Sequence, residues 1–260
     1  MDLSQEERLV KLQVDALFDP SFGDRVNSDL DSLPLKNGKL INLRTGVVRD
    51  RVMTDLFTFE CPVTYLVDDA PCPNAKLLFE YAFRKDVELI DYVQQLMGYL
   101  ITGYACEDNM YFLYGPEGDI MKMSSGIFIV MALSQILGEF SAGWNPNLEA
   151  FRLEMLRGHR LISILDPNGV EAMKLVQDGR IFSNSNKTPK MTKFALLVNQ
   201  PPAPGEHISS LRLPTSPDKL GKAVPVYLRK CLDEIFTLVA RGARRWYQNG
   251  CKLKPPGTPS

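Results

Sequence analysis

Histidine is scarce in this sequence, and cysteine occurs without the paired spacing of metal sites. The 260 residues include two histidines, His159 and His207, and five cysteines, at positions 61, 72, 106, 231 and 251. No C-x-x-C pair is present, which argues against a zinc site built from cysteine and histidine. The odd number and the scattered spacing argue against a disulfide framework. We therefore expect no metal site, and reduced thiols in an intracellular, reducing compartment.

Long apolar runs and an excess of either charge are also missing. The longest apolar run, residues 127–137, is too short to span a bilayer, and the polar, acidic start MDLSQEERLV is unlike a secretory signal. Thirty basic residues balance 31 acidic ones, so no overall field attracts nucleic acid or an anionic membrane. We expect no membrane partner, and any contact with DNA must be local.

The third absence is the glycine-lysine-hydroxyl triplet of a phosphate-binding loop, in a segment that otherwise starts like such a loop. Residues 110–118 read MYFLYGPEG, an apolar strand that enters a Gly/Pro-rich turn, as in the nucleotide-binding strand–loop–helix unit. Such a loop uses small residues that let backbone N–H groups wrap the phosphates, a lysine that reaches their outer oxygens, and a Ser/Thr hydroxyl for the metal. The glycine-lysine-hydroxyl triplet should follow.

The chain instead continues DIMKMSSGIF into an apolar helix over 127–137. Counting forward from Gly115 places Ile120 and Met121 at the Gly-Lys positions, with Lys122 one place late. Counting back from the helix gives Gly126 followed by two large apolar residues. The residues that would bind a phosphate are Gly115, Gly118, Lys122 and Ser124.

The pattern of the remaining chain divides it into two halves. Residues 3–17 are typical of a short amphipathic helix, residues 36–39 and 44–46 of tight turns between short strands, and residues 75–102 of a helix. The second half alternates apolar strands, MYFLY, LISIL, KFALLV and SLRL, with helices over 127–138, 147–157 and 226–248. Such strands are buried on both faces of a mainly parallel sheet, which indicates an α/β fold.

The order of these segments resembles the poxvirus-type primase–helicases and the related phage and plasmid primases. The similar segments are LPLKNGKLINLRTGVV, DLFTFECPVTYLVDDAPCP, DYVQQLMGYLITG, MYFLYGPEG, LRGHRLISILDPN, KFALLVNQPPAP and LVARGARRWYQNG, and the similarity extends over roughly residues 31–253. The resemblance implies a small, mostly helical N-terminal subdomain over 1–105 and a superfamily 3 helicase core of the AAA+, P-loop NTPase type over 106–253, followed by a disordered tail over 254–260. No counterpart of the upstream primase domain is included.

The resemblance also assigns roles to three residues. Asp166 would hold the metal or polarise the attacking water. Asn199 would sense the γ-phosphate, and Arg212 would be the arginine that one subunit inserts into the site of its neighbour. The Thr-Gly-Gly-Asp segment that relatives carry near residue 175 is replaced by LVQDGRIFSNSNK, so the DNA-facing part has also changed.

Basic and aromatic residues cluster near the end of the chain. Arg241, Arg244, Arg245 and Trp246 could contact single-stranded nucleic acid, because bases stack on aromatic rings and arginines bind phosphates. On a helix the three arginines share one side, which is also typical of a solvated face or of contact with the carboxylates of a neighbouring subunit. Both interpretations stay open at this point.

The resulting hypothesis is a degenerate helicase-like protein of a virus or mobile element, with no cofactor and no ATP turnover. It would act as an assembly or scaffold partner, through homo-oligomers or another protein, in a replication complex or a virion. Its location would be the nucleus, a cytoplasmic virus factory or the virion. One rival is an active DNA helicase that binds ATP and Mg through Lys122. The other is an accessory protein that binds single-stranded DNA.

Overall fold

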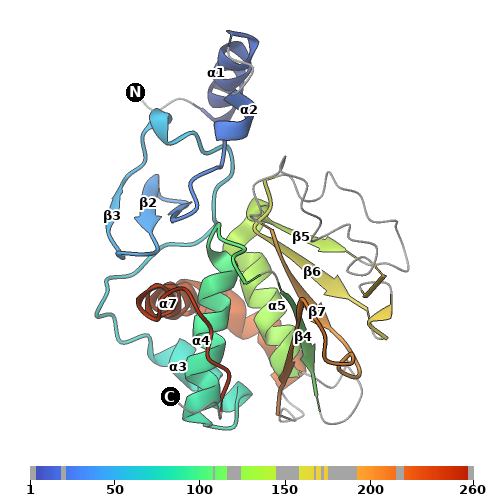
Figure 1. Cartoon of the computed structure of the whole chain (residues 1–260). Coiled ribbons are helices and arrows are strands. Elements are labelled where there is room, and N and C mark those ends of the chain that lie inside the picture. The colour runs from blue at the N-terminus through green and yellow to red at the C-terminus, as the bar shows by residue number, and fades with distance from the viewer. Residues whose placement is uncertain are drawn as a thin grey trace.

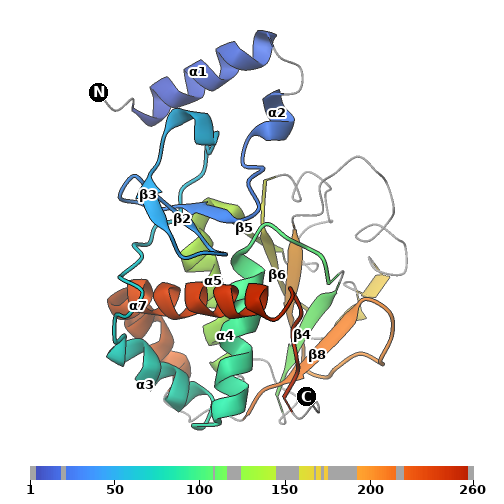
Figure 2. The same cartoon turned by 60° about the vertical axis from the view of Figure 1, so that its left-hand side comes forward.

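A computed structural model gives the arrangement of the chain. It describes residues 4–18, 22–107, 109–115, 124–144, 158–166, 168–170, 173–174, 192–214 and 220–256. The predicted helix over 147–157, and residues 118 and 122 of the candidate loop, therefore lie outside the described residues. The two views show the start of the chain, drawn in blue, above the remaining helices and the larger sheet (Figures 1 and 2).

The N-terminal part combines helices with a small antiparallel sheet. Its helical elements are α1 (Gln5–Phe18), α2 (Phe22–Arg25), the 3-10 turn η1 (Met53–Asp55), α3 (Pro73–Ala82) and α4 (Val87–Ile101). The sheet consists of β1 (Ser32–Pro34), β2 (Lys39–Asn42) and β3 (Val48–Asp50), paired in chain order. The two predicted turns connect these strands, and Gly38 and Gly46 have φ angles of 70° and 76° that favour glycine.

The helix predicted over 75–102 is in fact two helices. Arg84 and Lys85 between them have φ angles of 57° and 58°, in the left-handed region that ends a helix. Asp86 then begins α4, because its carboxylate accepts a hydrogen bond from the backbone N–H of Leu89 at 3.0 Å. The break lets α3 and α4 turn back on each other (Figure 2).

The second half forms a parallel sheet with a fixed order. Its elements are β4 (Met110–Tyr114), α5 (Ser124–Leu137), η3 (Gly138–Phe140), β5 (Ser141–Trp144), β6 (Leu161–Leu165), β7 (Lys193–Leu197), β8 (Ile208–Arg212) and α7 (Leu220–Gln248). The strand order is β5-β6-β7-β4-β8, and all four pairings are parallel. The prediction of an α/β fold with a mainly parallel sheet and a C-terminal helix is confirmed.

The apolar strands are buried because alternate residues enter two different cores. Tyr111 and Leu113 of β4 belong to a large cluster that also contains residues of α4, α5 and α7. Met110 and Phe112 enter a smaller cluster on the other face, with Ile162 and neighbours from β6 and β7. This alternation explains why strands without a polar face are stable here. The large cluster continues into the N-terminal part, across the predicted boundary at residue 105, which stays a prediction.

Two buried cations join the N-terminal part to the sheet. Arg160, at the start of β6, donates hydrogen bonds to the backbone carbonyls of Ile101 (3.0 Å), Asp29 (2.7 Å) and Ser32 (2.7 Å). Its guanidinium also lies 5.2 Å from the ring centroid of Phe140. Because carbonyls at the end of a helix lack intrahelical partners and carry partial negative charge, a cation at the end of α4 stabilises them.

Lys193, the first residue of β7, makes the corresponding contact beside it. Its Nζ donates to the carbonyls of Thr102 and Tyr104 at the end of α4. Burial lowers the pKa of the Lys193 ammonium well below its usual value, and the nearby Arg160 guanidinium acts in the same direction. These contacts place the N-terminal part against the amino ends of the strands and leave the carboxyl ends to the loops.

Replacement of Arg160 by Met should destabilise the protein by about 3 kcal/mol, because three buried carbonyls lose a donor and each such loss costs about 1 to 3 kcal/mol, partly offset by removal of a buried charge. Urea unfolding monitored by circular dichroism measures this. Arg160→Lys retains the charge with a different donor geometry and should lie between the wild type and Arg160→Met. Equal stability of all three proteins would show that this contact does not hold the two parts together.

Candidate functional site

The candidate site is the edge of the parallel sheet at which the strands end. Since all strands of this sheet are parallel, their carboxyl ends meet on one side, where ligands of open α/β sheets bind. β4 has β7 on one side and β8 on the other, and the chain leaves β4 at Gly115 toward α5. The edge therefore gathers residues from β4, β6, β7 and β8, with the end of β4 between the ends of β7 and β8.

Asp166 and Asn199 come together at this edge. Asp166 directly follows β6 and is buried, and its carbonyl accepts a hydrogen bond from Gly169 at 3.0 Å, which closes a turn after the strand. The register pairs Leu165 with Leu197, so Asp166 continues beside Val198, and the half-buried Asn199 follows. The two polar residues thus follow adjacent strands, and their roles stay a prediction.

Gly115 lies on the next strand of the same edge. The backbone N–H of Val198 donates to the carbonyl of Leu113 at 3.1 Å, which holds the end of β7 against the end of β4. Gly115 is half-buried at the point where β4 ends, and Ser124 is the first residue of α5. The other two candidate phosphate ligands, Gly118 and Lys122, lie outside the described residues.

Arg212 lies on the far side of β4. It is the last residue of β8, is exposed, and pairs in register with Tyr114. β7 and β4 separate β8 from β6, so the backbones at Arg212 and Asp166 are three strand spacings apart, about 14 Å. The structure therefore brings Asp166, Asn199 and Gly115 to neighbouring strands and places Arg212 apart from them, on an edge strand.

The basic and aromatic residues of α7 do not form a nucleic-acid site. Trp246 is fully buried and packs against Tyr99, Tyr104 and Tyr247, with ring centroids 4.9, 6.3 and 4.8 Å apart. A base has no access to its ring. The interpretation of Trp246 as a stacking platform is therefore corrected, since the amphipathic pattern of the helix turns this aromatic face to the core.

The three arginines of the same helix contact their own chain. Arg241 donates to the carbonyl of Ala70 at 2.7 Å, and Arg244 pairs with Asp68 at 2.5 Å. Arg245 pairs with Asp91 of α4 at 3.1 Å and donates to Gln94 at 2.9 Å. Each of the three arginines therefore has a partner within the chain, and contact of this face with another chain stays a prediction.

The glycines of the family-like segments lie where helices meet. A Cβ on Gly98 of α4 would come within 2.1 Å of the backbone nitrogen of Ala243, and one on Gly242 of α7 within 2.0 Å of the carbonyl oxygen of Gln94. The two backbones therefore touch at the crossing of α4 and α7, which only glycine permits. The sequence pattern does not reveal this role of the two glycines. It also does not reveal the buried cations Arg160 and Lys193, because a basic residue before an apolar strand ordinarily lies in solvent.

Two features of the described residues bear on the membrane and metal predictions. Within the described ranges, no helix is long and apolar enough to cross a membrane. The described side chains also contain no group of three or more His, Cys, Asp or Glu residues that could hold a metal ion. All five cysteines are free, and burial raises the pKa of the Cys61 thiol to about 12.

No family model matches the sequence, and no curated protein matches it either. Solved structures of the NrS-1 C-terminal region share the fold. One, an A form apo structure, has a TM-score of 0.51 and 11% sequence identity over 80% of this chain and 54% of its own. A second apo structure of the same region covers 80% of this chain and 55% of its own, with the same score and identity. This chain thus spans about half the length of those structures, and the likeness shows a distant relationship in fold.

Replacement of Trp246 by Ala should lower the free energy of unfolding by about 3 to 5 kcal/mol, because it removes a fully buried indole. Tyr227→Ala on the exposed side of the same helix is the control, and it should change stability by less than about 0.5 kcal/mol. Chemical unfolding supplies both values. An unchanged stability of Trp246→Ala, together with weaker binding of single-stranded DNA, would restore the nucleic-acid interpretation.

Proposed function

We propose that this chain is a helicase-like protein of a virus or mobile element that does not hydrolyse ATP and acts as an assembly partner, in a replication complex or a virion. One observation carries the proposal. The sheet has the order and the polar edge of a P-loop NTPase core, whereas the segment between β4 and α5 lacks the glycine-lysine-hydroxyl triplet. The scaffold of the enzyme is present and its phosphate-binding chemistry is altered.

The start of α5 supports the loss of phosphate binding. In a phosphate-binding loop the lysine and the hydroxyl residue stand at the first turn of the helix that follows the loop. Here α5 begins with Ser124 and Ser125, and Lys122 precedes the helix by two residues. The buried Ser125 hydroxyl lies 3.4 Å from the carbonyl of Pro214, within hydrogen-bond distance. In the sequence, no lysine directly follows a glycine of this loop.

A second candidate function, an active ATPase, is favoured by Asp166 and Asn199. These residues end adjacent strands at the edge where a nucleotide would bind, and Asp166 is buried. In that case Asp166 would hold Mg or polarise the attacking water, Asn199 would contact the γ-phosphate, and Lys122 would bind the phosphates. The loop sequence places Ile120 and Met121 where this rival needs a glycine and a lysine.

The purified chain should show no ATP turnover with Mg above that of a blank, because bulky side chains replace the glycine and lysine that admit phosphate. A coupled ADP-release assay measures turnover, with and without single-stranded DNA. In parallel, millimolar ATP should leave the melting temperature unchanged, whereas a ligand at 100 times its Kd adds about 2.7 kcal/mol of stability. Steady hydrolysis that disappears in both Lys122→Ala and Asp166→Asn would establish the active enzyme instead.

Arg212 is the residue that we assign to the assembly contact. It is exposed at the end of β8, and β8 is an edge strand of the sheet. Edge strands present backbone groups and side chains that another chain can contact. The arginines Arg241, Arg244 and Arg245 of α7 contact their own chain. Arg212, the remaining arginine of the candidate site, is exposed and available for contact with a neighbour.

Arg212→Ala should weaken self-association or capture of a partner by about tenfold, because an arginine at an interface contributes about 1.4 kcal/mol or more. Sedimentation velocity over a range of concentrations measures self-association, and the exposed Arg229 of α7 provides the control Arg229→Ala. A chain that stays monomeric at high concentration, and that recovers no partner from its native source, would remove the support for the assembly role.

A further inference from the structure

The strand β3 is at the edge of the small antiparallel sheet, on the outer side of the N-terminal part (Figures 1 and 2). Among the described residues, no strand pairs with its other side. The carbonyl of Val47 accepts a hydrogen bond from β2, and the N–H of Arg51 donates to the turn before β2, both at 2.9 Å. Since bonded positions alternate along an antiparallel ladder, the backbone groups of Val48 and Asp50 point away from β2.

The outward backbone groups are free over a short stretch of β3. In the described part of the chain, the N–H and carbonyl of Val48 and the N–H of Asp50 have no hydrogen-bond partner. The carbonyl of Asp50 accepts from the Arg49 guanidinium at 3.0 Å. The next outward N–H, that of Val52, donates to the carboxylate of Asp55 at 2.8 Å. The open edge is therefore as long as one short strand.

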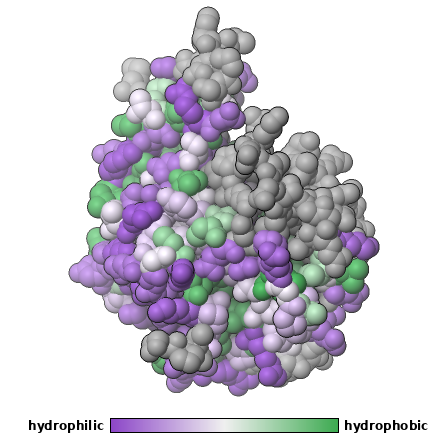
Figure 3. Space-filling view, in the orientation of Figure 1, coloured by the Kyte–Doolittle hydropathy of each residue, from purple (hydrophilic) through white to green (hydrophobic). Residues whose placement is uncertain are grey.

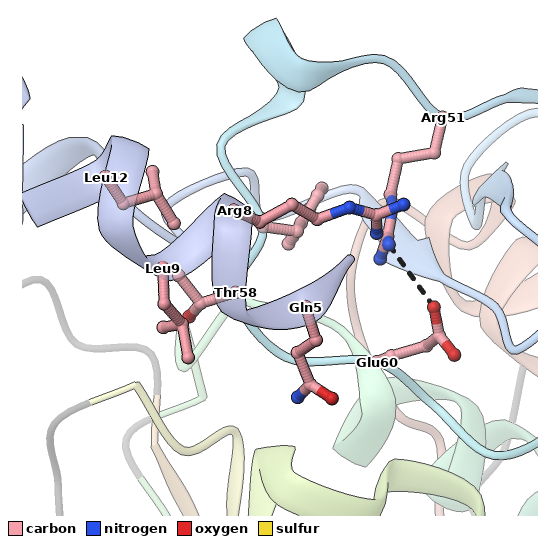
Figure 4. Close-up of a pocket in the computed structure, with 8 residues that line it drawn as sticks. Gln5, Arg8, Leu9, Leu12, Arg51, Thr58 and Glu60 are labelled. Atoms are coloured by element: carbon pink, nitrogen blue, oxygen red, sulfur yellow. Dashed lines mark ion pairs between the residues drawn. The ribbon is translucent and has the colours of Figure 1, made fainter. Parts of the chain in front are cut away.

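The charged side chains along this edge are paired within the chain. The pairs are Arg49 with Asp55 at 2.5 Å, Asp50 with Lys39 at 2.7 Å, and Arg51 with Glu60 at 3.3 Å. Figure 4 shows the last pair as a dashed line. A segment that binds here needs no opposite charge, because each of these charges already has its counterion.

Apolar side chains are exposed on and beside the same edge. Val47, Val48, Val52 and Met53 are between 40% and 61% exposed. Figure 3, in the orientation of Figure 1, shows apolar residues interspersed along the margin where β3 lies. Valines favour pairing with a neighbouring strand, and an exposed apolar edge strand is a site at which another chain can pair.

The free groups fit an extended backbone. One residue of an added strand can donate its N–H to the Val48 carbonyl and accept from the Val48 N–H, and the carbonyl two residues away can accept from Asp50. A helix cannot do this, because its own ladder uses these backbone groups. Strand addition to a sheet edge is an established mode of peptide recognition, in which backbone hydrogen bonds give affinity and alternate side chains give specificity.

A second copy of this chain fits the edge poorly. A two-fold register that pairs Val48 with Asp50 of the copy sets Arg49 against the same residue of the copy, and a register centred on Asp50 sets two aspartates against each other. Like charges directly opposite destabilise a strand pair. A register centred on Val48 extends into the turn at Gly46, whose φ angle of 76° is not that of a strand.

We infer that β3 binds an extended segment of a partner protein, which becomes the fourth strand of the small sheet. The segment is uncharged at its centre and carries β-branched or aromatic residues at alternate positions, which pack on Val48 and its apolar neighbours. The inference deepens the proposed assembly role and depends on it for the partner. The contact is separate from Arg212 and the P-loop, so the tests of those residues and the test of β3 can fail independently.

Selection of phage-displayed random decapeptides on the immobilised full chain supplies the probe, and fluorescence anisotropy of a selected, fluorescein-labelled peptide gives its Kd. The peptide is then methylated at one backbone nitrogen at a time. Methylation should weaken binding by about tenfold at alternate positions and have little effect at the positions between them, because only alternate N–H groups face β3. Equal effects at neighbouring positions, or a selection that yields proline-rich peptides or none, would overturn the inference.

Val48→Pro tests the same contact from the side of the protein. It removes a free N–H without removing a hydrogen bond to β2, and proline is tolerated at such edge positions. It should weaken binding of the peptide by about tenfold or more. Val48→Thr keeps the N–H and the branched side chain and should bind like the wild type, and circular dichroism checks that both variants are folded.

Two results with these variants would contradict the inference. One is unchanged binding of the peptide to folded Val48→Pro. The other is a dimer of the peptide-free chain in sedimentation velocity that Val48→Pro dissociates, because the edge would then bind a second copy instead of a partner.

Discussion

The end of α4 is held by two buried cations, and the position of the N-terminal part depends on this contact. Arg160 and Lys193 stand at the amino ends of neighbouring strands and donate to the carbonyls that α4 leaves without partners. Burial opposes both charges, because it lowers the pKa of each group. The carbonyls and the partial negative charge of the helix end offset this cost. The N-terminal part is thereby fixed at one edge of the sheet, and the edge with Asp166 and Asn199 lies at the other.

A second contact ties α7 to the same region. The crossing of α4 and α7 brings backbone against backbone at Gly98 and Gly242. The turn after β2 also touches α7, where Arg244 lies against Gly46 and Arg44 stacks on Tyr247 at 4.4 Å. The segments that resemble the helicase family are therefore, in large part, places where elements meet. Packing contacts account for Gly98 and Gly242 without reference to phosphate binding.

The strands and the main architecture could be predicted from the sequence because their signals are local. MYFLY, LISIL and KFALL are mostly apolar. Gly38 has a positive φ angle, which glycine adopts readily in a tight turn. The break between α3 and α4 has no glycine or proline, and Asp86 was its only signal. The start of α7 at Leu220 was missed because Pro225 indicates a helix boundary, whereas the helix continues through it with a distortion at Cys231.

The site could be predicted only where strand ends determine it. Asp166 and Asn199 each follow an apolar strand, and parallel pairing brings such ends together. The pattern of α7 did not reveal that Trp246 faces the core, because an arginine-rich helix end with aromatic residues is also typical of a nucleic-acid surface. Burial is decided by the partner elements, here α4 and the loop after it with Tyr104, and these lie far from α7 in the sequence.

Native-state hydrogen exchange tests the central claim, which is that the buried cations make the N-terminal part and the sheet one cooperative unit. The amides of Gly103, whose N–H bonds to Leu30 at 2.7 Å, and of Lys193, whose N–H bonds to Arg160 at 2.9 Å, report on the two sides of the contact. If the two parts form one cooperative unit, both amides should exchange with the free energy of global unfolding. Exchange of Gly103 and the β1–β2 amides at a clearly lower free energy than the sheet would show that the two parts unfold separately, and would contradict the account.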